Sequence, residues 1–421
     1  MNKFSKLTLI STSFLFLLSS NLISQEVEEV VVTASKKAES IQDLALSVEA
    51  FTAESITENM IEDFSDLAEV VPGLIMDKGI GSGASYSIRG TGSYGVGAAV
   101  IGSVVTASNG HNYNSSSIAD IGFFDVERIE VLKGPQGTKF GRNAVAGLIN
   151  MITARPTGEF GGAYSIELGN LSTTQFNGHI NIPISDTMRS RFAVVTKKRD
   201  GTTYNINTKN YFNDINAWGA RFSFDWDLGD STTLKLTTEH FEGDDNRNNI
   251  GTAVCQSDPF FGCNPLVTGQ PNQTPDSRGT TAALFNLIGA LDFTADRNSY
   301  AGAITPNTFR EANLSRDPVH QQTSQSSTLE LNHELSDELL LNVQVTYNHR
   351  DYFHSGDNDY SVSNGSFPGL AAIPGFPMTW NGCFGGYNGT GFCENIDSDR
   401  TYEFAVVETY STQFEVSLVS D

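Results

Sequence analysis

The stretch "NAWGARFSFDWDL" (216–228) decides the fold, because aromatic and charged residues alternate along it. One set of alternate positions holds Trp218, Ala220, Phe222, Phe224, Trp226 and Leu228, and the other holds Gly219, Arg221, Ser223, Asp225 and Asp227. Successive side chains of a β-strand point to opposite faces, so one face of this strand is apolar and the other is polar. Over about twelve residues, this pattern is typical of a membrane-spanning strand with its apolar side facing lipid.

The connections between such segments support the same interpretation, although alternation alone also occurs in half-buried sheets of soluble proteins. Further alternating segments are centred on Tyr164, Ile166 and Leu168, on Phe176, Ile180 and Ile182, on Leu234 and Leu236, on Leu341, Val343, Val345 and Tyr347, and on Phe414, Val416 and Leu418. Short Asp-containing turns alternate with long loops, with "GNLST" as the one short connection on the long-loop side. The short turns are "ISDTM" (184–188), "LGDST" (228–232) and "LSDEL" (335–339). Outer-membrane barrels sort their loops in this way.

We therefore predict a mainly β protein in which residues 159–421 form about eight antiparallel strands of a transmembrane β-barrel. The last segment, "TQFEVSLVSD", runs to Asp421 without the terminal aromatic residue of such barrels. We expect that the chain is a C-terminally truncated part of a longer barrel.

The N-terminal residues predict export. "MNKFSK" carries two lysines and is followed by the apolar run "LTLISTSFLFLLSS", the pattern of a signal peptide, which we place at residues 1–25. The net charge of −23 argues against nucleic acid as a partner, because neutralising phosphates requires a basic surface.

Residues 38–158 have the mixed pattern of a small α+β domain. We predict a strand at "SVEAF" (47–51), a helix that opens at Thr52, and a second helix that ends at Pro72-Gly73. The stretch "EVLKGPQGTKFGRN" (130–143) has the strand, glycine turn and lysine of a phosphate-binding loop. However, Lys139 stands one place too early for that motif and the metal-binding hydroxyl is missing, so phosphate binding is excluded.

Two stretches resemble a known family, the TonB-dependent outer-membrane receptors. "EEVVVTASK", which directly follows the predicted signal peptide, resembles the TonB box, and we place the box and its linker at residues 26–37. "FDVERIEVLKGPQGTKFGRNAVAGLINMIT" (124–153) resembles the plug-domain motif, and "SIRG" (87–90) resembles an earlier plug motif. The resemblance implies a plug domain inside a barrel of about 22 strands, in the outer membrane of a Gram-negative bacterium.

The resemblance also implies roles for individual residues. The TonB box would be Glu29, Val30, Val31, Val32, Thr33 and Ala34, a segment that pairs with the sheet edge of the inner-membrane-anchored TonB protein. An ordinary edge strand of the plug is the alternative. The plug motif would comprise Arg89, Gly90, Arg128, Glu130, Gly134, Pro135, Gly137, Gly141, Arg142, Asn143 and Gly147. Of these, Arg128, Glu130 and Arg142 are candidates for contacts with the barrel wall, and the glycines for positive φ or close backbone approach.

The transported ligand stays open at this point. A scarce nutrient, by default a ferric siderophore, is what the resemblance implies, and a carbohydrate or cobalamin is compatible with the residues. Aromatic residues of the expected loops, Phe260, Phe261, Tyr352 and Phe353, are candidates for stacking on a planar ligand. Many relatives carry an aromatic-x-Asp-Gly strand between the two plug motifs, but "GAAVIGSVVTASNG" (97–110) lacks it, which puts the transfer of ligand-contacting plug residues in doubt.

The remaining functional residues are few. The cysteines form two close pairs in the longest loops, and we predict the disulfides Cys255–Cys263 and Cys383–Cys393. Zinc is the competing interpretation, but neither pair has CxxC spacing. No acid–base or nucleophile motif is found, so we predict no catalytic residues, no cofactor, no metal site and no enzyme activity. A passive porin-like or adhesin barrel without energy coupling is the functional alternative from another class.

Overall fold

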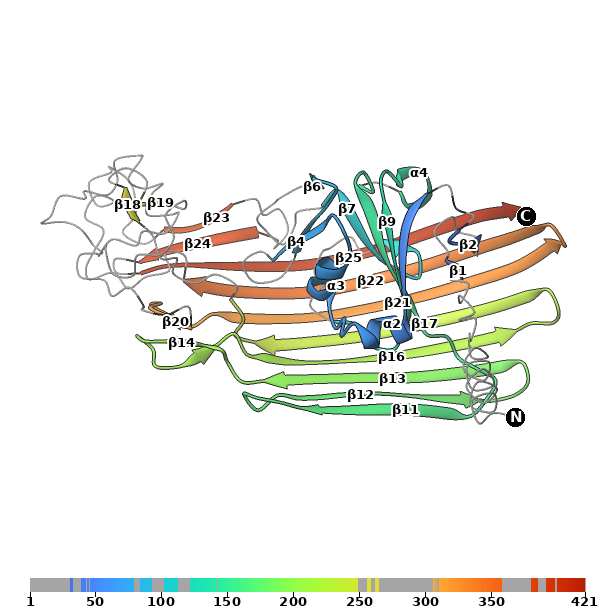
Figure 1. Cartoon of the computed structure of the whole chain (residues 1–421), viewed down its shortest axis with the longest axis horizontal. Coiled ribbons are helices and arrows are strands. Elements are labelled where there is room, and N and C mark those ends of the chain that lie inside the picture. The colour runs from blue at the N-terminus through green and yellow to red at the C-terminus, as the bar shows by residue number, and fades with distance from the viewer. Residues whose placement is uncertain are drawn as a thin grey trace, which may run out of the picture.

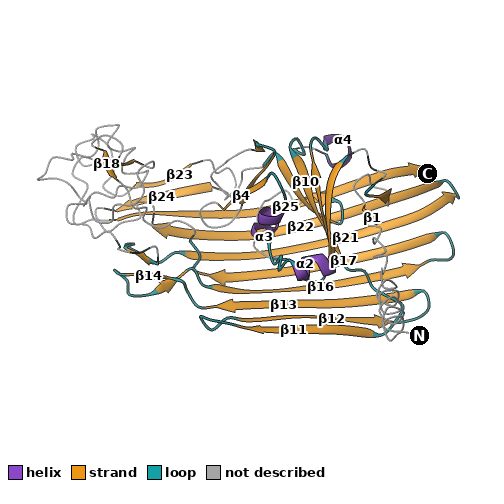
Figure 2. Ribbon diagram, viewed as in Figure 1, coloured by secondary structure: helices purple, strands orange, loops and turns teal. Residues whose placement is uncertain are grey.

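The computed structural model describes residues 31–32, 39–42, 44, 46–78, 84–92, 102–112, 122–141, 143–248, 256–258, 262–264, 306, 308, 310–357, 380–384, 391–397 and 400–420. It consists of a small mixed unit, formed by the N-terminal part of the chain, and a large antiparallel sheet formed by the rest (Figure 1). The helices of the described residues all belong to the small unit (Figure 2).

The small unit, which we call the plug unit, is built on a five-stranded sheet with the strand order β3-β9-β10-β7-β8. These strands are β3 (Ser47–Thr52), β7 (Val104–Ser108), β8 (His111–Asn112), β9 (Val126–Lys133) and β10 (Gly147–Thr153). A second sheet contains β4 (Leu74–Lys78), β5 (Ala84–Ile88) and β6 (Thr91–Gly92), and a two-stranded ribbon contains β1 (Val31–Val32) and β2 (Glu39–Ser40). The helices are α2 (Ala53–Glu58), α3 (Phe64–Val70) and α4 (Gly137–Phe140).

Local capping explains where the two longer helices begin. The side chain of Thr52 accepts a hydrogen bond from the Ser55 N–H at the start of α2. Asp63 forms a capping box with Asp66 at the start of α3, which satisfies backbone N–H groups that a helix leaves unpaired. The predicted strand at 47–51, the helix opening at Thr52 and the second helix are confirmed. Gly73 follows α3 with a φ of 80°, a value at which glycine is not strained.

The large sheet contains the strands in the order β11-β12-β13-β16-β17-β21-β22-β25-β24-β23. Eight of them are long: β11 (Gly161–Leu168), β12 (Thr174–Pro183), β13 (Met188–Arg199), β16 (Ile215–Asp227), β17 (Thr232–Asp245), β21 (Val319–Ser336), β22 (Leu339–Asp357) and β25 (Arg400–Ser420). β24 (Gly391–Asp397) and β23 (Trp380–Phe384) extend one edge. The predicted fold class, with about eight antiparallel strands after the plug, is confirmed. Most of these strands reach the roughly 9–11 residues that cross a bilayer.

The connections of the large sheet are sorted by length, as predicted, and the short connection 169–173 between β11 and β12 is the expected exception. The short turns 184–187, 228–231 and 337–338 lie at one end of the sheet, on the right in Figure 1. The long connections join β13 to β16, β17 to β21, and β22 to β25, and these strands enter and leave them at the other end. Described parts of them include β14 (Thr203–Asn205), β15 (Tyr211–Phe212), β18 (Gln256–Asp258), β19 (Gly262–Asn264) and β20 (Glu311–Ala312). We call these two ends of the sheet the turn end and the loop end.

The plug unit lies against one face of the large sheet, which we call the inner face (Figure 1). Its own core is apolar and includes Phe64, Leu67, Ile129, Val131 and Ile149. Within the described residues, no helix combines the length and the apolarity needed to cross a bilayer.

Candidate functional site

The inner face of the large sheet is polar and buried, whereas the outer face is apolar and exposed. Along β16, Arg221, Ser223 and Asp225 point inward and are buried. Trp218 on the outer face is 40% exposed. Other large apolar side chains exposed on the outer face are Tyr164, Ile166, Phe192, Val345, Tyr347, Phe414, Val416 and Leu418. This arrangement is the reverse of a water-soluble sheet, and it confirms the two faces predicted for 216–228.

A buried ion pair joins the plug unit to the inner face at Asp125. This residue immediately precedes β9 and has a φ of 49°, which is uncommon for a residue other than glycine. Arg191 of β13 forms a two-pronged salt bridge with Asp125, and its Nε donates to Oδ2 at 2.8 Å. Both side chains are more than nine-tenths buried. A bidentate arginine–carboxylate pair fixes position as well as charge, so Asp125 anchors β9 to the wall.

Arg221 of β16 makes a second anchor beside the first. Its Nη1 donates to the backbone carbonyls of Phe124 at 3.0 Å and Asp125 at 3.1 Å. The guanidinium lies over the Phe124 ring, 4.4 Å from the centroid, and forms a salt bridge with Glu239 of β17. The buried charge therefore has a carboxylate partner, and its remaining donors hold the plug backbone.

Further polar contacts connect the two units. Arg155 follows β10 and reaches the wall, where it pairs with Asp225 and donates to Thr237 at 2.7 Å. Lys197 of β13 pairs with Glu62 at 2.6 Å. Other bridging contacts are Gln413 Nε2 to the Asn112 carbonyl oxygen at 2.7 Å and a close contact between His111 and Gln344. Polar contacts of this kind leave the interface less apolar than a domain core, as is common between two units of one chain.

Arg128 and Glu130 lie on one face of β9, as predicted, and contact each other. The Arg128 Nε donates to Glu130 Oε1 at 2.9 Å, and Asn150 of β10 donates to the other Glu130 oxygen at 3.4 Å. Arg128 also pairs with Glu127. The buried Glu130 thus has a charged partner within the plug unit. A role of this pair at the barrel wall stays a prediction, and Arg142 lies outside the described residues.

The glycines of the motif serve the loop between β9 and β10. Gly134 and Gly141 have φ values of 107° and 79°, and Asn143 has 72°. Gly147 is needed for space, because a Cβ there would lie 2.4 Å from the Leu132 carbonyl oxygen. The predictions of positive φ and of close approach are therefore confirmed for these glycines. Gly137 is different: it begins α4, its φ is not positive and a Cβ would meet nothing.

The loop residues around these glycines also have fixed positions. The loop is closed by backbone hydrogen bonds from Gly134 to Ala146 and from Gln136 to Ala144, with the exposed Pro135 between the two donors.

The "SIRG" motif forms a turn after β5. Arg89 and Gly90 both have positive φ, 53° and 74°. The Arg89 guanidinium donates to the Ser47 hydroxyl at 2.7 Å, and its backbone N–H donates to the Gly73 carbonyl at 2.8 Å. The turn thus connects β5 to β3 and to the end of α3.

Two residues of the predicted TonB box lie in a short strand on the plug unit. Val31 and Val32 form β1, which pairs with Ser40 and Glu39 of β2. The Val32 side chain is fully buried in an apolar cluster with Leu132, Phe140, Ala144 and Leu148 of the β9–β10 hairpin and with Val105 and Ala107 of β7. Figure 1 places β1 and β2 toward the turn end of the sheet. The plug motif hairpin therefore holds this strand. Glu29, Val30, Thr33 and Ala34 lie outside the described residues.

A second cluster lies on the inner face near the loop end. Asp245, His320 and His354 are cross-strand neighbours on β17, β21 and β22, and all three are buried. The His320 Nδ1 lies 3.1 Å from Asp245 Oδ1. Tyr352 packs edge-on against His320 at 5.6 Å, and the Arg350 guanidinium lies 4.8 Å from the Tyr352 ring centroid. The cluster combines a carboxylate, imidazoles, an aromatic ring and a guanidinium, groups that bind polar and aromatic ligands.

The predicted loop position of Tyr352 and Phe353 is wrong, because both lie within β22. The strand continues to Asp357 because it pairs with β21 on one side and β25 on the other. The residues after Tyr352 are mostly polar, because this part of the strand borders a polar interior. The alternation of apolar and polar residues therefore stops there, although the strand continues. Tyr352 is on the inner face, whereas Phe353 alternates to the outer face. Phe260 and Phe261 lie outside the described residues.

The structure describes the backbone of three of the four cysteines. Cys383 of β23 and Cys393 of β24 are direct partners in the register of these two strands. Cys263 lies in β19, and Cys255 lies outside the described residues. Both disulfides stay predictions.

The anchors Asp125, Arg191 and Glu239 were missed by the sequence reasoning. Asp125 stands in the quoted motif, and Arg191 and Glu239 are charged residues at inward positions of predicted strands. A charged residue at an inward position of a membrane strand indicates that the side chain needs a partner. The sequence does not show which residue that partner is.

Comparison with known proteins gives the family context. Residues 40–148 match the family model described as TonB-dependent Receptor Plug Domain. The chain is 32% identical over 169 residues to the vitamin B12 transporter BtuB of Vibrio vulnificus, a match over 37% of this chain and 27% of that protein. It is 25% identical over 376 residues to the ferric enterobactin receptor PirA of Pseudomonas aeruginosa, over 79% of this chain and 49% of that protein.

Solved structures give the same fold. The siderophore receptor PiuA of Acinetobacter baumannii superimposes with a TM-score of 0.60 and 16% identity, over 94% of this chain and 45% of that one. At this identity the likeness concerns the fold. The chain spans about half the length, or less, of these relatives.

Proposed function

The chain belongs to the TonB-dependent outer-membrane receptors, and we propose from this that it takes part in the energised import of a scarce nutrient, a ferric siderophore. The ligand would enter from the loop end of the sheet and meet the inner-face cluster around His320 and Tyr352. TonB would bind the box (29–34) at the turn end and pull on it. The plug unit would then loosen from the wall and open a path.

The observation that carries this proposal is the position of β1. In the part of the chain that the structure describes, the strand is held by a two-residue ladder and by the buried side chain of Val32. Burial of a valine contributes about 1.5–3 kcal/mol, so the strand is removable by a modest force. Because Val32 packs on Leu132, Phe140 and Leu148, its removal leaves a gap in the β9–β10 hairpin. A pull on the box would therefore act on the hairpin whose first strand, β9, directly follows the wall anchor Asp125.

Val32→Pro tests the box, because proline lacks the N–H that a sheet partner requires. The full-length protein carrying V32P should lose binding to the purified periplasmic domain of TonB and should lose uptake, with a normal amount in the outer membrane. V32I, which keeps the N–H and the β-branched shape, is the matched control and should retain both. Unchanged uptake by V32P would refute energy coupling through this segment and would favour a passive barrel.

The ligand class rests on two kinds of support. Arg350, His320 and Tyr352 offer cationic and aromatic contacts, which suit an anionic chelate with planar groups. Relatives named as siderophore receptors match both the sequence and the fold. Cobalamin is the second candidate, because the BtuB protein of Vibrio vulnificus is 32% identical over the matched region.

Growth of a deletion strain separates the two candidates. Loss of the protein should impair growth when iron is supplied only as a ferric siderophore, and should leave growth on limiting cobalamin unchanged. The opposite result would assign the protein to cobalamin.

A further inference from the structure

Three side chains with metal-ligating atoms meet on the outer face of the large sheet, on the side opposite the plug unit. His349 and Asp351 are two residues apart on β22 and therefore point to the same face. Glu408 comes from β25, where it is the direct register partner of Asp351. The apolar residues Tyr347 and Val345 precede them on this face toward the turn end. The group thus lies where the apolar band gives way to polar residues.

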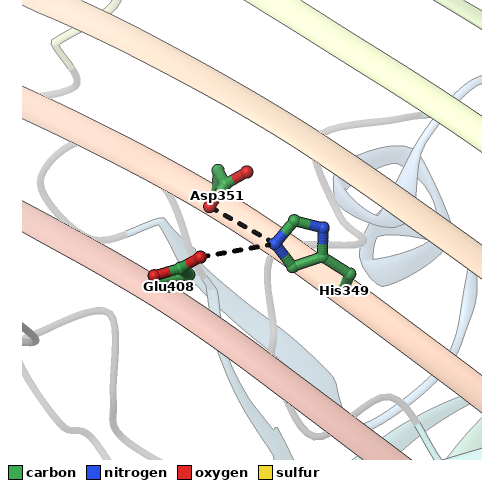
Figure 3. A group of neighbouring side chains, drawn as sticks. All are labelled: His349, Asp351 and Glu408. Atoms are coloured by element: carbon green, nitrogen blue, oxygen red, sulfur yellow. Dashed lines mark ion pairs between the residues drawn. The ribbon is translucent and has the colours of Figure 1, made fainter. Parts of the chain in front are cut away.

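The ligand atoms of the three side chains all lie within 4.8 Å of one another, close enough to share one metal ion. The His349 Nε2 lies 3.4 Å from Asp351 Oδ1 and 3.8 Å from Glu408 Oε1 (Figure 3). Figure 3 shows both carboxylates directed at this one ring nitrogen. The separations exceed the roughly 2.7–3.2 Å of N–H···O hydrogen bonds. Two ligands placed about 2.0–2.1 Å from a tetrahedral zinc ion lie about 3.3–3.4 Å apart, which is close to the shorter separation.

The environment of His349 gives an independent indication of a ligand. Its Nε2 has no contact with solvent and no hydrogen-bond partner among the described residues. A buried polar atom without a partner destabilises the folded state, and a metal ion would satisfy it. The ring is held by stacking on Tyr410, with centroids 4.4 Å apart and an interplanar angle of 6°. The Tyr410 hydroxyl donates to Glu408, which orients this carboxylate as outer groups orient metal ligands.

We propose that His349, Asp351 and Glu408 bind a divalent transition-metal ion of the zinc class, with a fourth position open toward the outside. One imidazole and two carboxylates suit zinc, whereas calcium takes six to eight oxygen ligands and magnesium needs an octahedral set. The ion would join β22 to β25 near the loop end and would stabilise the wall. The site lies on the outer face, so it is separate from the nutrient path. Two of its ligands come from β22 and the third comes from β25, much further along the chain, which is why no spacing motif revealed it.

Zinc binding by the full-length protein tests this site directly. The protein is purified in detergent without a histidine tag, treated with chelator and titrated with Zn²⁺ in a calorimeter. The wild type should bind one more zinc ion than the variants H349A, D351N and E408Q, or bind it at least about tenfold more tightly. Zinc should also raise the unfolding temperature of the wild type more than that of the variants, because a ligand of the folded state stabilises it.

A matched control lies on the same face of the sheet. His240 and Glu242 of β17 form a similar pair at 4.0 Å but have no third ligand in the described residues. The variant H240A/E242Q should bind zinc as the wild type does. Tetrahedral Co²⁺ absorption in the wild type, absent in H349A, would support the geometry. Equal zinc binding by the wild type and by all three site variants, or no zinc binding by the wild type, would overturn the proposal.

Discussion

Arg191 and Arg221 show at the scale of single residues how a polar wall holds a plug. Both arginines are buried. Arg191 reaches Asp125, and Arg221 reaches the backbone of Phe124 and Asp125, the two residues before β9. A buried charge is costly unless it is paired. Arg221 pairs with Glu239 inside the wall, whereas the pair of Arg191 with Asp125 runs between the two units. Separation of the units therefore exposes both partners to water, where each can be solvated. A contact that is stable in the closed state and whose partners can be solvated after separation is compatible with the proposed opening of the plug.

Arg191→Met should weaken the anchoring of the plug unit strongly, because Asp125 would stay buried with its main cationic partner removed. The expected cost is about 3–5 kcal/mol, seen as faster hydrogen exchange of the β9 amides. Arg189→Met is the matched control on the same strand. Arg189 pairs with Asp227 at 2.8 Å in a partly exposed position, so its loss should cost about 0–1 kcal/mol. Equal exchange in both variants would contradict the anchor role of Asp125.

At the scale of elements, the β9–β10 hairpin connects β1, the plug core and the wall. Its residues Leu132 and Leu148 pack on Val32, and Asp125 at its start meets the wall. Gly147 lets the hairpin lie close to β5, because a Cβ there would come within 2.6 Å of the Ile88 side chain. Close packing around this element is the physical basis of the proposed coupling between β1 and the anchor.

Substitutions of two hairpin glycines should have opposite effects on the plug. Gly147→Ala should destabilise it by about 1–3 kcal/mol, because the added methyl group meets backbone and core atoms. Gly137→Ala should stabilise it by about 0.4–1 kcal/mol, because the position is open and the change reduces the freedom of the unfolded chain. Scanning calorimetry of both full-length variants measures the shifts. A destabilised G137A with an unaffected G147A would show that the hairpin packs differently.

The elements were largely predictable from the sequence, whereas their partners were not. Alternation in 216–228 and the Asp-containing turns identified strands because membrane strands have two chemically distinct faces. The same rule failed at Tyr352 and Phe353, where the strand continues past its apolar band. Asp125 and Arg191 are 66 residues apart in the chain, and nothing local in either segment specifies that they meet. Likewise, Val32 and Phe140 are far apart in the chain, and neither local sequence shows that the two side chains pack together.

At the scale of the whole molecule, the two faces of the large sheet have opposite environments. The outer face exposes aromatic and branched apolar side chains, and the inner face buries arginine, serine and aspartate. Burying polar groups while exposing apolar ones is unfavourable in water and favourable in lipid. The distribution therefore fits a wall that separates a bilayer from the plug unit.

Phe222→Arg tests this orientation. The position lies on the outer face in the middle of β16 and packs against Phe192, so arginine there should cost about 2–4 kcal/mol of folding free energy in lipid vesicles. Gln325→Arg lies on the outer face of β21 toward the loop end, and it should cost about 0–1 kcal/mol. Folding yields into vesicles across a urea series measure both. Similar costs at the two positions would contradict a lipid-facing band.

Ligand uptake in cells with and without TonB tests the central claim most directly. The full-length protein is expressed in an iron-limited strain that lacks its own copy, and accumulation of ⁵⁵Fe from ferric siderophores is followed over time. The account predicts accumulation that requires both this protein and TonB and that disappears when residues 29–34 are deleted. Equal accumulation in the presence and absence of TonB would contradict it.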